Sequence, residues 1–258
     1  MDTIIAIPSM ILLCALVGFA GFVDASAGGG GTISLPAYIF VGIPPHFALG
    51  CNKLSASCGT TLAVFNFWKS GAIDVKAALI AALGSFIGAA TGAAIALKLS
   101  EQTLETMLLF ILPIAAIIIL AKRNFGEDDL SSTVGKTKAV ILAFFIGFLI
   151  GGYDGMFGPG TGTFAIIAFS MLMKYDLKTA SGNAKILNLA SNYASFATFA
   201  ISGTVIYKIA IPAAICGMIG NHFGSRCSIT RGAKFIRPMM LGVLALLLTK
   251  IAYDLLTR

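Results

Sequence analysis

The two halves of this 258-residue chain repeat one another. A glycine-rich segment and an apolar stretch that contains a lysine both return in the second half at a nearly constant offset. The matched positions are Asp24, Gly28 and Gly30 with Asp154, Gly158 and Gly160, and Ala48, Gly50, Lys53 and Phe67 with Ala180, Gly182, Lys185 and Phe199. Two related halves, each with a glycine-rich break and a buried charge, are typical of secondary transporters.

The composition indicates that the solvent of this fold is lipid. Hydrophobic residues make up 57% of the chain and charged residues 11%, and the mean hydropathy is +0.92. A soluble domain carries roughly a quarter charged residues, so we predict an all-α, polytopic helical membrane protein. The N-terminal apolar run continues to Val23 with no basic residue before it, which favours a span over a cleaved signal peptide. The net charge of +7 is interpreted as loop charge that sets orientation, and no nucleic-acid partner is expected.

Each half is predicted to contain five membrane elements. They are residues 3–23, 32–43, 47–68, 75–98 and 103–121 in the first half, and 137–153, 163–173, 180–206, 208–226 and 236–256 in the second. The predicted organisation is an N-terminal repeat of residues 1–125, a hydrophilic connector of residues 126–136 and a C-terminal repeat of residues 137–258.

The second element of each half is short, and it decides the topology. A helix of about 12 residues is ~18 Å long, against a hydrocarbon core of ~30 Å. It is either re-entrant, or it crosses only because the glycine-rich loop before it lies within the membrane. If it crosses, most loop lysines and arginines share one side: Lys69, Lys76, Lys122, Arg123, Lys136, Lys138, Lys174, Lys178, Arg226, Arg231, Lys234 and Arg237, against Lys98, Lys208, Lys250 and Arg258. A re-entrant element would divide them almost evenly. The positive-inside rule therefore favours two inverted repeats with both termini outside.

The glycine-rich loops are the first candidate site. Glycine permits conformations that leave backbone N–H groups free, and each loop opens a short helix whose N-terminus favours an anion. The candidate substrate-binding residues are Gly28, Gly29, Gly30, Gly31 and Thr32 in the first loop, and Gly158, Gly160, Thr161 and Thr163 in the second. The alternative is that both loops are tight turns between packed helices.

The paired lysines are the second candidate. Lys53 and Lys185 each lie about two turns into an apolar helix, where a charge is expensive unless it is partnered or hydrated. They are interpreted as cationic anchors for an anionic substrate. The alternatives are side chains that extend to the interface, or structural ion pairs with Asp24 or Asp154. The two aspartates are assigned to charge balance or proton coupling.

Amide side chains accompany the lysines on the same helices. Asn52 adjoins Lys53, while Asn188 and Asn192 follow Lys185 at helical spacing. Such a polar stripe either bonds neighbouring helices or lines a pathway, and we favour the pathway. Faces of small residues, at Gly84, Gly88 and Gly92 and at Gly220 and Gly224, predict close helix packing without a substrate role.

Metal and catalytic chemistry have no support in the sequence. The five cysteines and two histidines show no metal-ligand spacing. No catalytic constellation and no nucleotide-binding loop is found, so no cofactor, no metal and no enzymatic activity are expected.

The paired motifs resemble a known family. The segments GFVDASAGGGGTISLPAYIFVGIPPHFALGCNK and GGYDGMFGPGTGTF, the latter followed by TASGNAKILNLASN, are similar to the signature regions of the sulfite exporter TauE/SafE family of membrane permeases. The resemblance implies a prokaryotic-type plasma-membrane protein that moves sulfur-containing anions such as sulfite or sulfonates. It suggests Asp24, Gly28–Gly31, Asn52, Lys53, Asp154, Gly158, Pro159, Gly160, Lys185, Asn188 and Asn192 as motif positions. Cys51 stands where the family commonly has threonine, which leaves the substrate more open.

The expected function is a multi-pass permease of the plasma (inner) membrane, for sulfite or an organosulfonate, working by alternating access. The alternatives are a transporter of a carboxylate or a cation, an anion channel and, least favoured, an intramembrane enzyme or assembly factor. The sequence leaves open the direction of transport, coupling to protons or sodium, and assembly into a homo-oligomer.

Overall fold

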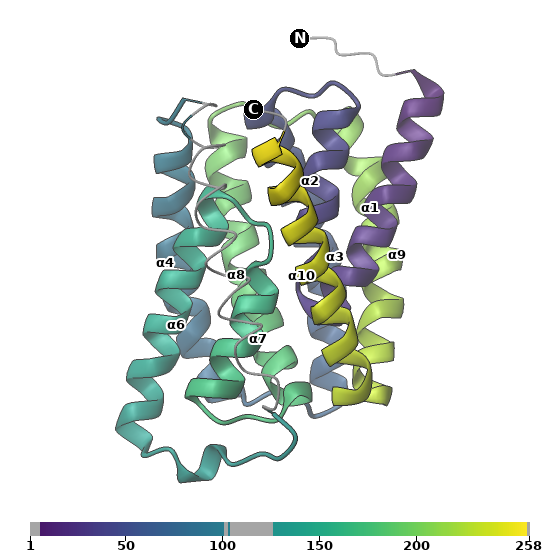
Figure 1. The fold of residues 1–258 in the computed structure, drawn as a ribbon. Helices are drawn as coiled ribbons and strands as arrows, with labels where there is room; N and C mark the ends of the chain where they lie inside the picture. Colours follow the sequence, from purple (N-terminus) through teal and green to yellow (C-terminus); the bar gives the residue numbers. More distant parts are fainter. Residues whose placement is uncertain (1–5, 101–102, 104–125, 257–258) are drawn as a thin grey trace.

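The fold is a bundle of helices (Figure 1), seen in a computed structural model that describes residues 6–100, 103 and 126–256. Within these residues there is no strand. The helices are α1 (Ile7–Ala27), α2 (Gly31–Phe40), α3 (Pro45–Lys69), α4 (Val75–Ala96), α6 (Lys136–Met156), α7 (Thr161–Leu172), α8 (Leu177–Ile201), α9 (Tyr207–Arg231) and α10 (Ala233–Leu256), with a 3-10 turn at Ser131–Thr133. The predicted element 103–121 lies outside the described residues except for Thr103, as do residues 122–125 ahead of the connector.

The other nine predicted elements are confirmed as helices, with ends that shift by a few residues. Local sequence signals set several of these ends. Prolines occupy the first turns of α1 and α3, where no intrahelical N–H donor is required. Asp74 caps α4 by accepting from the N–H of Ala77 at 3.1 Å, and Asp176 caps α8 by accepting from the N–H of Lys178 at 3.0 Å.

The glycine-rich loops are shorter than predicted. We expected irregular backbone from Asp24 and from Asp154, but α1 continues to Ala27 and α6 to Met156. Both aspartates therefore lie in the last turns of their helices. α1 ends directly at Gly28, which has a positive φ of 78°. In the second half, Phe157 leaves the helical conformation first, and Gly158, with a φ of 90°, follows it. Side chains other than glycine rarely adopt a positive φ.

The predicted glycine faces hold helices together in matching pairs. Gly84, Gly88 and Gly92 of α4 face backbone oxygens of α6, and Gly220 and Gly224 of α9 face backbone oxygens of α1. A Cβ at any of these glycines would overlap the facing helix. The packing prediction is confirmed, and α4 lies on α6 as α9 lies on α1. Close backbone approach of this kind suits helices in lipid, where hydrophobic burial does not drive association.

The chain direction differs between the halves. In Figure 1, α1 begins at the upper end and α2 returns to it, whereas α6 begins at the lower end and α7 returns to it. The turns between these helices lie in the interior of the bundle. Three described helices are long and apolar enough to cross a membrane by themselves: α1, α4 and α6. The 25-residue helices α3, α8 and α9 carry polar residues on buried faces, which lowers their mean hydropathy.

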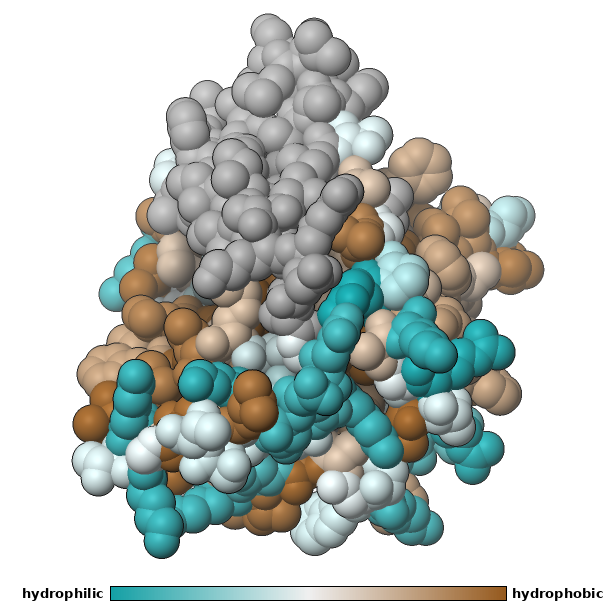
Figure 2. All heavy atoms as spheres, turned by 60° about the horizontal axis from the view of Figure 1, so that its bottom comes forward, coloured by the Kyte–Doolittle hydropathy of each residue, from teal (hydrophilic) through white to brown (hydrophobic). Residues whose placement is uncertain are grey.

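Basic residues gather at one end of the bundle. The connector folds back there, since the Leu130 N–H donates to the Lys174 carbonyl and the Leu177 N–H to the Gly126 carbonyl. Arg237 at the start of α10 pairs with Glu127 at 3.2 Å. Figure 2 shows the many hydrophilic side chains of this end. The described lysines and arginines that the sequence assigns to one side all belong to the loops and helix ends gathered here.

Candidate functional site

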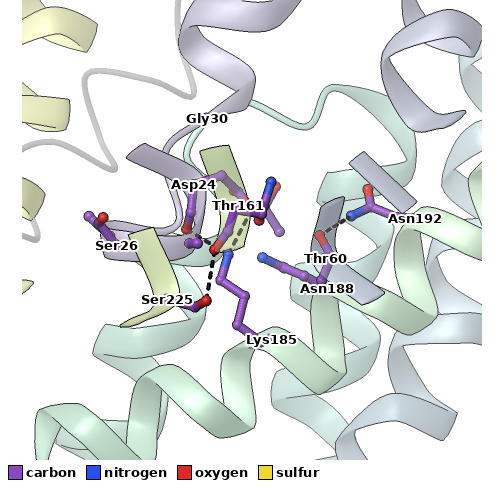
Figure 3. A network of polar contacts seen from close by, with 12 residues as sticks. Asp24, Ser26, Gly30, Thr60, Thr161, Lys185, Asn188, Asn192 and Ser225 are labelled. Atoms are coloured by element: carbon purple, nitrogen blue, oxygen red, sulfur yellow. Dashed lines mark hydrogen bonds and ion pairs between the residues drawn. The ribbon is translucent and has the colours of Figure 1, made fainter. Parts of the chain in front are cut away.

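Two buried ion pairs join the halves of the chain at the centre of the bundle. The Lys53 Nζ lies 2.8 Å from Oδ2 of Asp154. The Lys185 Nζ lies 2.7 Å from Oδ2 of Asp24 and also donates to the Asp24 carbonyl oxygen at 2.6 Å (Figure 3). The exposed fractions of Lys53 and Lys185 are 1% and 0%. Each lysine therefore forms an ion pair with the aspartate of the other half, as one of the two alternatives required, and the other alternative, in which the lysines extend to the interface, is wrong.

Helix register places these charges. Each lysine lies about two turns into its helix, α3 or α8, and the two aspartates lie one turn before a glycine turn. A buried charge left without its partner is strongly destabilising, because its desolvation is no longer offset. The crossed arrangement gives each of the four charges a partner only when the two halves pack together.

The two glycine turns touch each other beside the ion pairs. The Thr163 N–H donates to the Gly28 carbonyl at 3.3 Å, and the Thr163 hydroxyl donates to the Ala27 carbonyl at 2.7 Å. A Cβ on Gly28 would overlap the backbone of Gly162, and the reverse holds as well. Only glycine permits two backbones to meet this closely, so the turns are both tight connections and the walls of one site.

Free backbone donors belong to the same turns. Gly30 and Gly158 line the site, and within the described part of the chain neither N–H group has a hydrogen-bond acceptor. Gly158 lies beside the first ion pair, since the position of an added Cβ would be 3.6 Å from the Lys53 Nζ. Unpaired N–H groups at the starts of short helices are suited to hold an oxyanion.

A cavity of about 50 Å³ adjoins the Lys53–Asp154 pair. A water molecule needs about 10–15 Å³ of such space, so there is room for a few waters. The predicted site residues that line it are Asp24, Gly28, Gly30, Gly31, Asn52, Lys53, Asp154, Gly158, Thr161, Asn188 and Asn192. Gly29, Thr32, Gly160, Thr163 and Lys185 do not line it. Gly29 instead faces Val243 of α10, and Lys185 is enclosed by its contacts with Asp24.

Amide side chains extend the first ion pair. The Asn192 Oδ1 accepts from the Lys53 Nζ at 3.3 Å, and its Nδ2 donates to the Thr60 hydroxyl at 3.5 Å (Figure 3). The Oδ1 atoms of Asn188 and of Asn221 on α9 are buried and have no partner within the described residues. In the stripe predicted on α8, Asn192 bonds a neighbouring helix, and Asn188 and Asn192 both line the cavity.

The threonine hydroxyls are already engaged. Thr32 donates to the Gly29 carbonyl at 2.7 Å, and Thr161 donates to the Gly158 carbonyl at 2.7 Å. Each hydroxyl closes its own glycine turn, as the Thr163 hydroxyl does across to Ala27. These side chains stabilise the turns. Because each hydroxyl already donates its hydrogen, it can only accept a further hydrogen bond.

Sequence reasoning missed nine of the residues that line the cavity, among them Ser55, Gly162 and Asn221. Ser55 bonds the Tyr38 hydroxyl at 2.7 Å and lies on the lysine-bearing helix α3. Asn221 follows Gly220 in α9, and a buried amide beside a glycine face is the signal that could have identified it. Gly162 stands inside the motif but has no counterpart in the repeat pattern.

The cavity extends from the ion pairs towards one end of the bundle. Its lining residues on α1 run from Asp24 back towards the start of that helix, so it extends towards the end where α1 begins. The repeat counterparts of four polar lining residues are apolar. Ser34, Asn52, Ser55 and Asn221 line the cavity, and their repeat counterparts are Phe164, Ala184, Leu187 and Ala89. Leu187 and Ala184 are fully buried in the hydrophobic core. The polar cavity therefore has no equivalent at the counterpart positions, which carry apolar side chains.

Metal ligation finds no support in the described residues. They contain no group of three or more histidine, cysteine, aspartate or glutamate side chains that could hold an ion. The described site offers instead two ammonium groups, two carboxylates and two free N–H donors. Its formal charges balance, so an anion that binds there adds one uncompensated negative charge unless a proton or a cation binds with it.

Comparison with known proteins gives consistent results. The family model described as "Sulfite exporter TauE/SafE" matches residues 13–251. A "Probable membrane transporter protein" of Haemophilus influenzae is 32% identical over 95% of this chain and 94% of its own length. "Probable membrane transporter protein ORF9" of Sinorhizobium sp is 35% identical over 91% and 89%. "Probable membrane transporter protein YfcA" of Escherichia coli is 31% identical over 91% and 86%. No solved structure matches.

Proposed function

Because this chain belongs to the sulfite exporter TauE/SafE family, we propose that it is a secondary transporter for a small anion, sulfite or an organosulfonate. It acts as a multi-pass protein of the plasma membrane, without cofactor or catalytic activity. The membrane setting and a role in transport agree with the helical fold and with the relatives named as probable membrane transporters. The choice of a sulfur oxyanion follows the description of the family.

The observation that carries this proposal is the Lys53–Asp154 pair beside a polar cavity. Lys53 supplies positive charge, and the N–H groups of Gly30 and Gly158 supply donors that need no protonation change. All three groups belong to residues that line the same cavity, so an oxyanion that enters it is close to each of them. Asn188 and Asn192 shape the site, and the Lys185–Asp24 pair fixes the opposite wall.

Alternating access between two inverted repeats is the mechanism we propose. Residues 1–125 and 137–258 form the repeats, joined by the connector, and both termini lie outside. The opposite starts of α1 and α6 and the basic end of the bundle support this orientation. The cavity then leads outwards, and the apolar cluster of Phe164, Ala184 and Leu187 closes the inner side. Repacking of that cluster opens the site to the cytoplasm.

Charge balance also suggests the coupling ion. An anion that binds the Lys53 ammonium displaces the Asp154 carboxylate, which would then be buried and unpaired at high energetic cost. A proton on Asp154 removes that cost and restores the balance of charges at the site. Anion and proton therefore move together, one for one, in this mechanism.

Transport by purified protein in liposomes tests the proposal. We expect saturable uptake of radiolabelled sulfite that is stimulated by an inwardly directed proton gradient. Lys53→Ala should abolish it, whereas Glu127→Gln, in an exposed pair at the basic end, should not. Unchanged sulfite transport by Lys53→Ala would mean that this lysine holds no anion. Current that does not saturate would indicate a channel.

A second measurement separates the coupling from the substrate. Asp154→Asn replaces the carboxyl group with an amide, which does not take up or release a proton near neutral pH. We expect it to lose the response to the proton gradient. Thermal stabilisation by sulfite should remain, because Lys53 still binds the anion. Proton-driven uptake by Asp154→Asn at the parental rate would place the coupling group elsewhere, with Asp24 as the next candidate.

A further inference from the structure

A second and larger cavity, of about 310 Å³, lies at the basic end of the bundle. It is formed by the first turns of α4 and α6, the 3-10 turn of the connector and Tyr175. Its volume is within the range of small-molecule sites, about 300–1,000 Å³. It shares no residue with the cavity at the ion pairs.

Two lysines give this cavity an excess of positive charge. Lys76 and Lys136 both line it, and within the described chain neither forms an ion pair. The one acidic residue in the lining, Asp74, is already engaged: Ala77 and the Tyr175 hydroxyl donate to its two carboxylate oxygens. Burial, and then the bond to Asp74, raise the pKa of Tyr175, so this phenol stays a neutral donor. The nearby Asp129 accepts from the Ser131 N–H at 2.8 Å.

Neutral donors stand beside the lysines. The hydroxyls of Ser131 and Ser132 line the cavity. The start of α6, at Lys136, has no side-chain cap, because its N-cap residue is Gly135. The first N–H groups of that helix are therefore available to an anion, and the helix dipole favours one. At α4, by contrast, Asp74 occupies the corresponding position.

The rest of the lining is apolar and continues onto the outer surface of the helix pair. Ala77, Ile80 and Val140 form part of this apolar wall, later in α4 and α6 than the two lysines. Val140 is 40% exposed, and the neighbouring outward residue Leu79 is 59% exposed. A soluble anion would gain nothing from this wall. An amphiphile would place its charged group at the lysines and its chain along α4 and α6.

We propose that this cavity binds the headgroup of an anionic phospholipid. Basic pockets between transmembrane helices at the cytoplasmic side are suited to such headgroups. Lys76 and Lys136 would hold the phosphate, Ser131, Ser132 and the start of α6 would donate hydrogen bonds, and the acyl chains would cover the apolar wall. A lipid here bridges the N-terminal half, through α4, to the connector and α6.

Native mass spectrometry of the purified full-length protein tests this, with phosphatidylglycerol as the probe and phosphatidylcholine and inorganic phosphate as comparisons. The variant is Lys76→Gln/Lys136→Gln. The matched control is Lys138→Gln/Lys234→Gln, which removes two exposed lysines of the same end that do not line the cavity. We expect phosphatidylglycerol to bind the variant about thirtyfold more weakly than the parent, which is about 2 kcal/mol at tenfold per 1.4 kcal/mol. The control should bind as the parent does.

Three results would overturn the proposal: equal weakening in both double variants, equal retention of phosphatidylcholine by the parent, or displacement of phosphatidylglycerol by inorganic phosphate at comparable concentration. The last would mark a site for soluble anions. Melting curves verify that the variants are folded. Hydrogen–deuterium exchange on the parent gives an independent readout: phosphatidylglycerol should protect residues 131–140, and no protection there would also refute the site.

Discussion

Removal of one partner from the Lys53–Asp154 pair is the sharpest test of the central architecture. At 2.8 Å and an effective dielectric of about 20, the Coulomb attraction between the two groups is about 6 kcal/mol. Both groups are almost completely buried, so a single neutralised partner leaves the other charge without compensation. We expect Asp154→Asn and Lys53→Met each to reduce the free energy of unfolding by about 3–5 kcal/mol.

The double variant distinguishes the ion pair from ordinary packing. Lys53→Met/Asp154→Asn leaves no unpaired charge at this position, and we expect it to be more stable than either single variant, with a coupling of about 2 kcal/mol or more. Its transport should nevertheless be absent, because the cationic anchor is gone. Melting temperatures in detergent, at about 2–4 °C per kcal/mol for a chain of this size, give the four values of the cycle.

The exposed pair at the basic end is the control. Glu127 is 70% exposed at the side chain, and Glu127→Gln should change stability by no more than about 1 kcal/mol. Additive effects of the two central substitutions would refute the coupled pair. Transport by the double variant at the parental rate would refute the role of Lys53 as the anion anchor, whatever the stabilities.

Three further predictions concern glycine contacts and the asymmetric lining. Gly162→Ala should abolish transport and lower the melting temperature, because its Cβ overlaps the facing turn, whereas Gly242→Ala, which has open space, should be tolerated; transport assays and melting curves compare them. Asn221→Ala should weaken sulfite binding several-fold in a thermal-shift titration. The stability change should be under about 1 kcal/mol, since its Oδ1 has no partner to lose and its Nδ2 donates only to the Gly217 carbonyl of the same helix, at 3.0 Å. Gly88→Ala and Gly220→Ala should destabilise to a similar degree in melting curves, because each Cβ overlaps a backbone oxygen of the facing helix, and a difference of several kcal/mol would contradict the matched packing.

The sequence alone was sufficient to predict a membrane protein, its helical segments and the correspondence between the motifs of the two halves. Apolar runs decide that segments are helical in lipid, because every backbone group must be satisfied within its own segment. The repeated positions then identified both lysines, both aspartates and both glycine turns. The loop boundaries were less accurate, because the helices continue through Asp24 and Asp154 to Ala27 and Met156.

Only the tertiary structure decided which charges meet. The repeat pattern places an aspartate and a lysine in each half, and nothing in a single half indicates that Lys53 pairs with Asp154 and Lys185 with Asp24. The sequence also did not indicate on which side of the ion pairs the cavity lies. It depends on Asn221 of α9 and Ser55 of α3 lining one cavity, while their repeat counterparts Ala89 and Leu187 are buried apolar residues. Such contacts form between helices that are far apart in the sequence. The order of residues does not indicate which of these helices pack together, and the packing decides which side chains fill space and which charges pair.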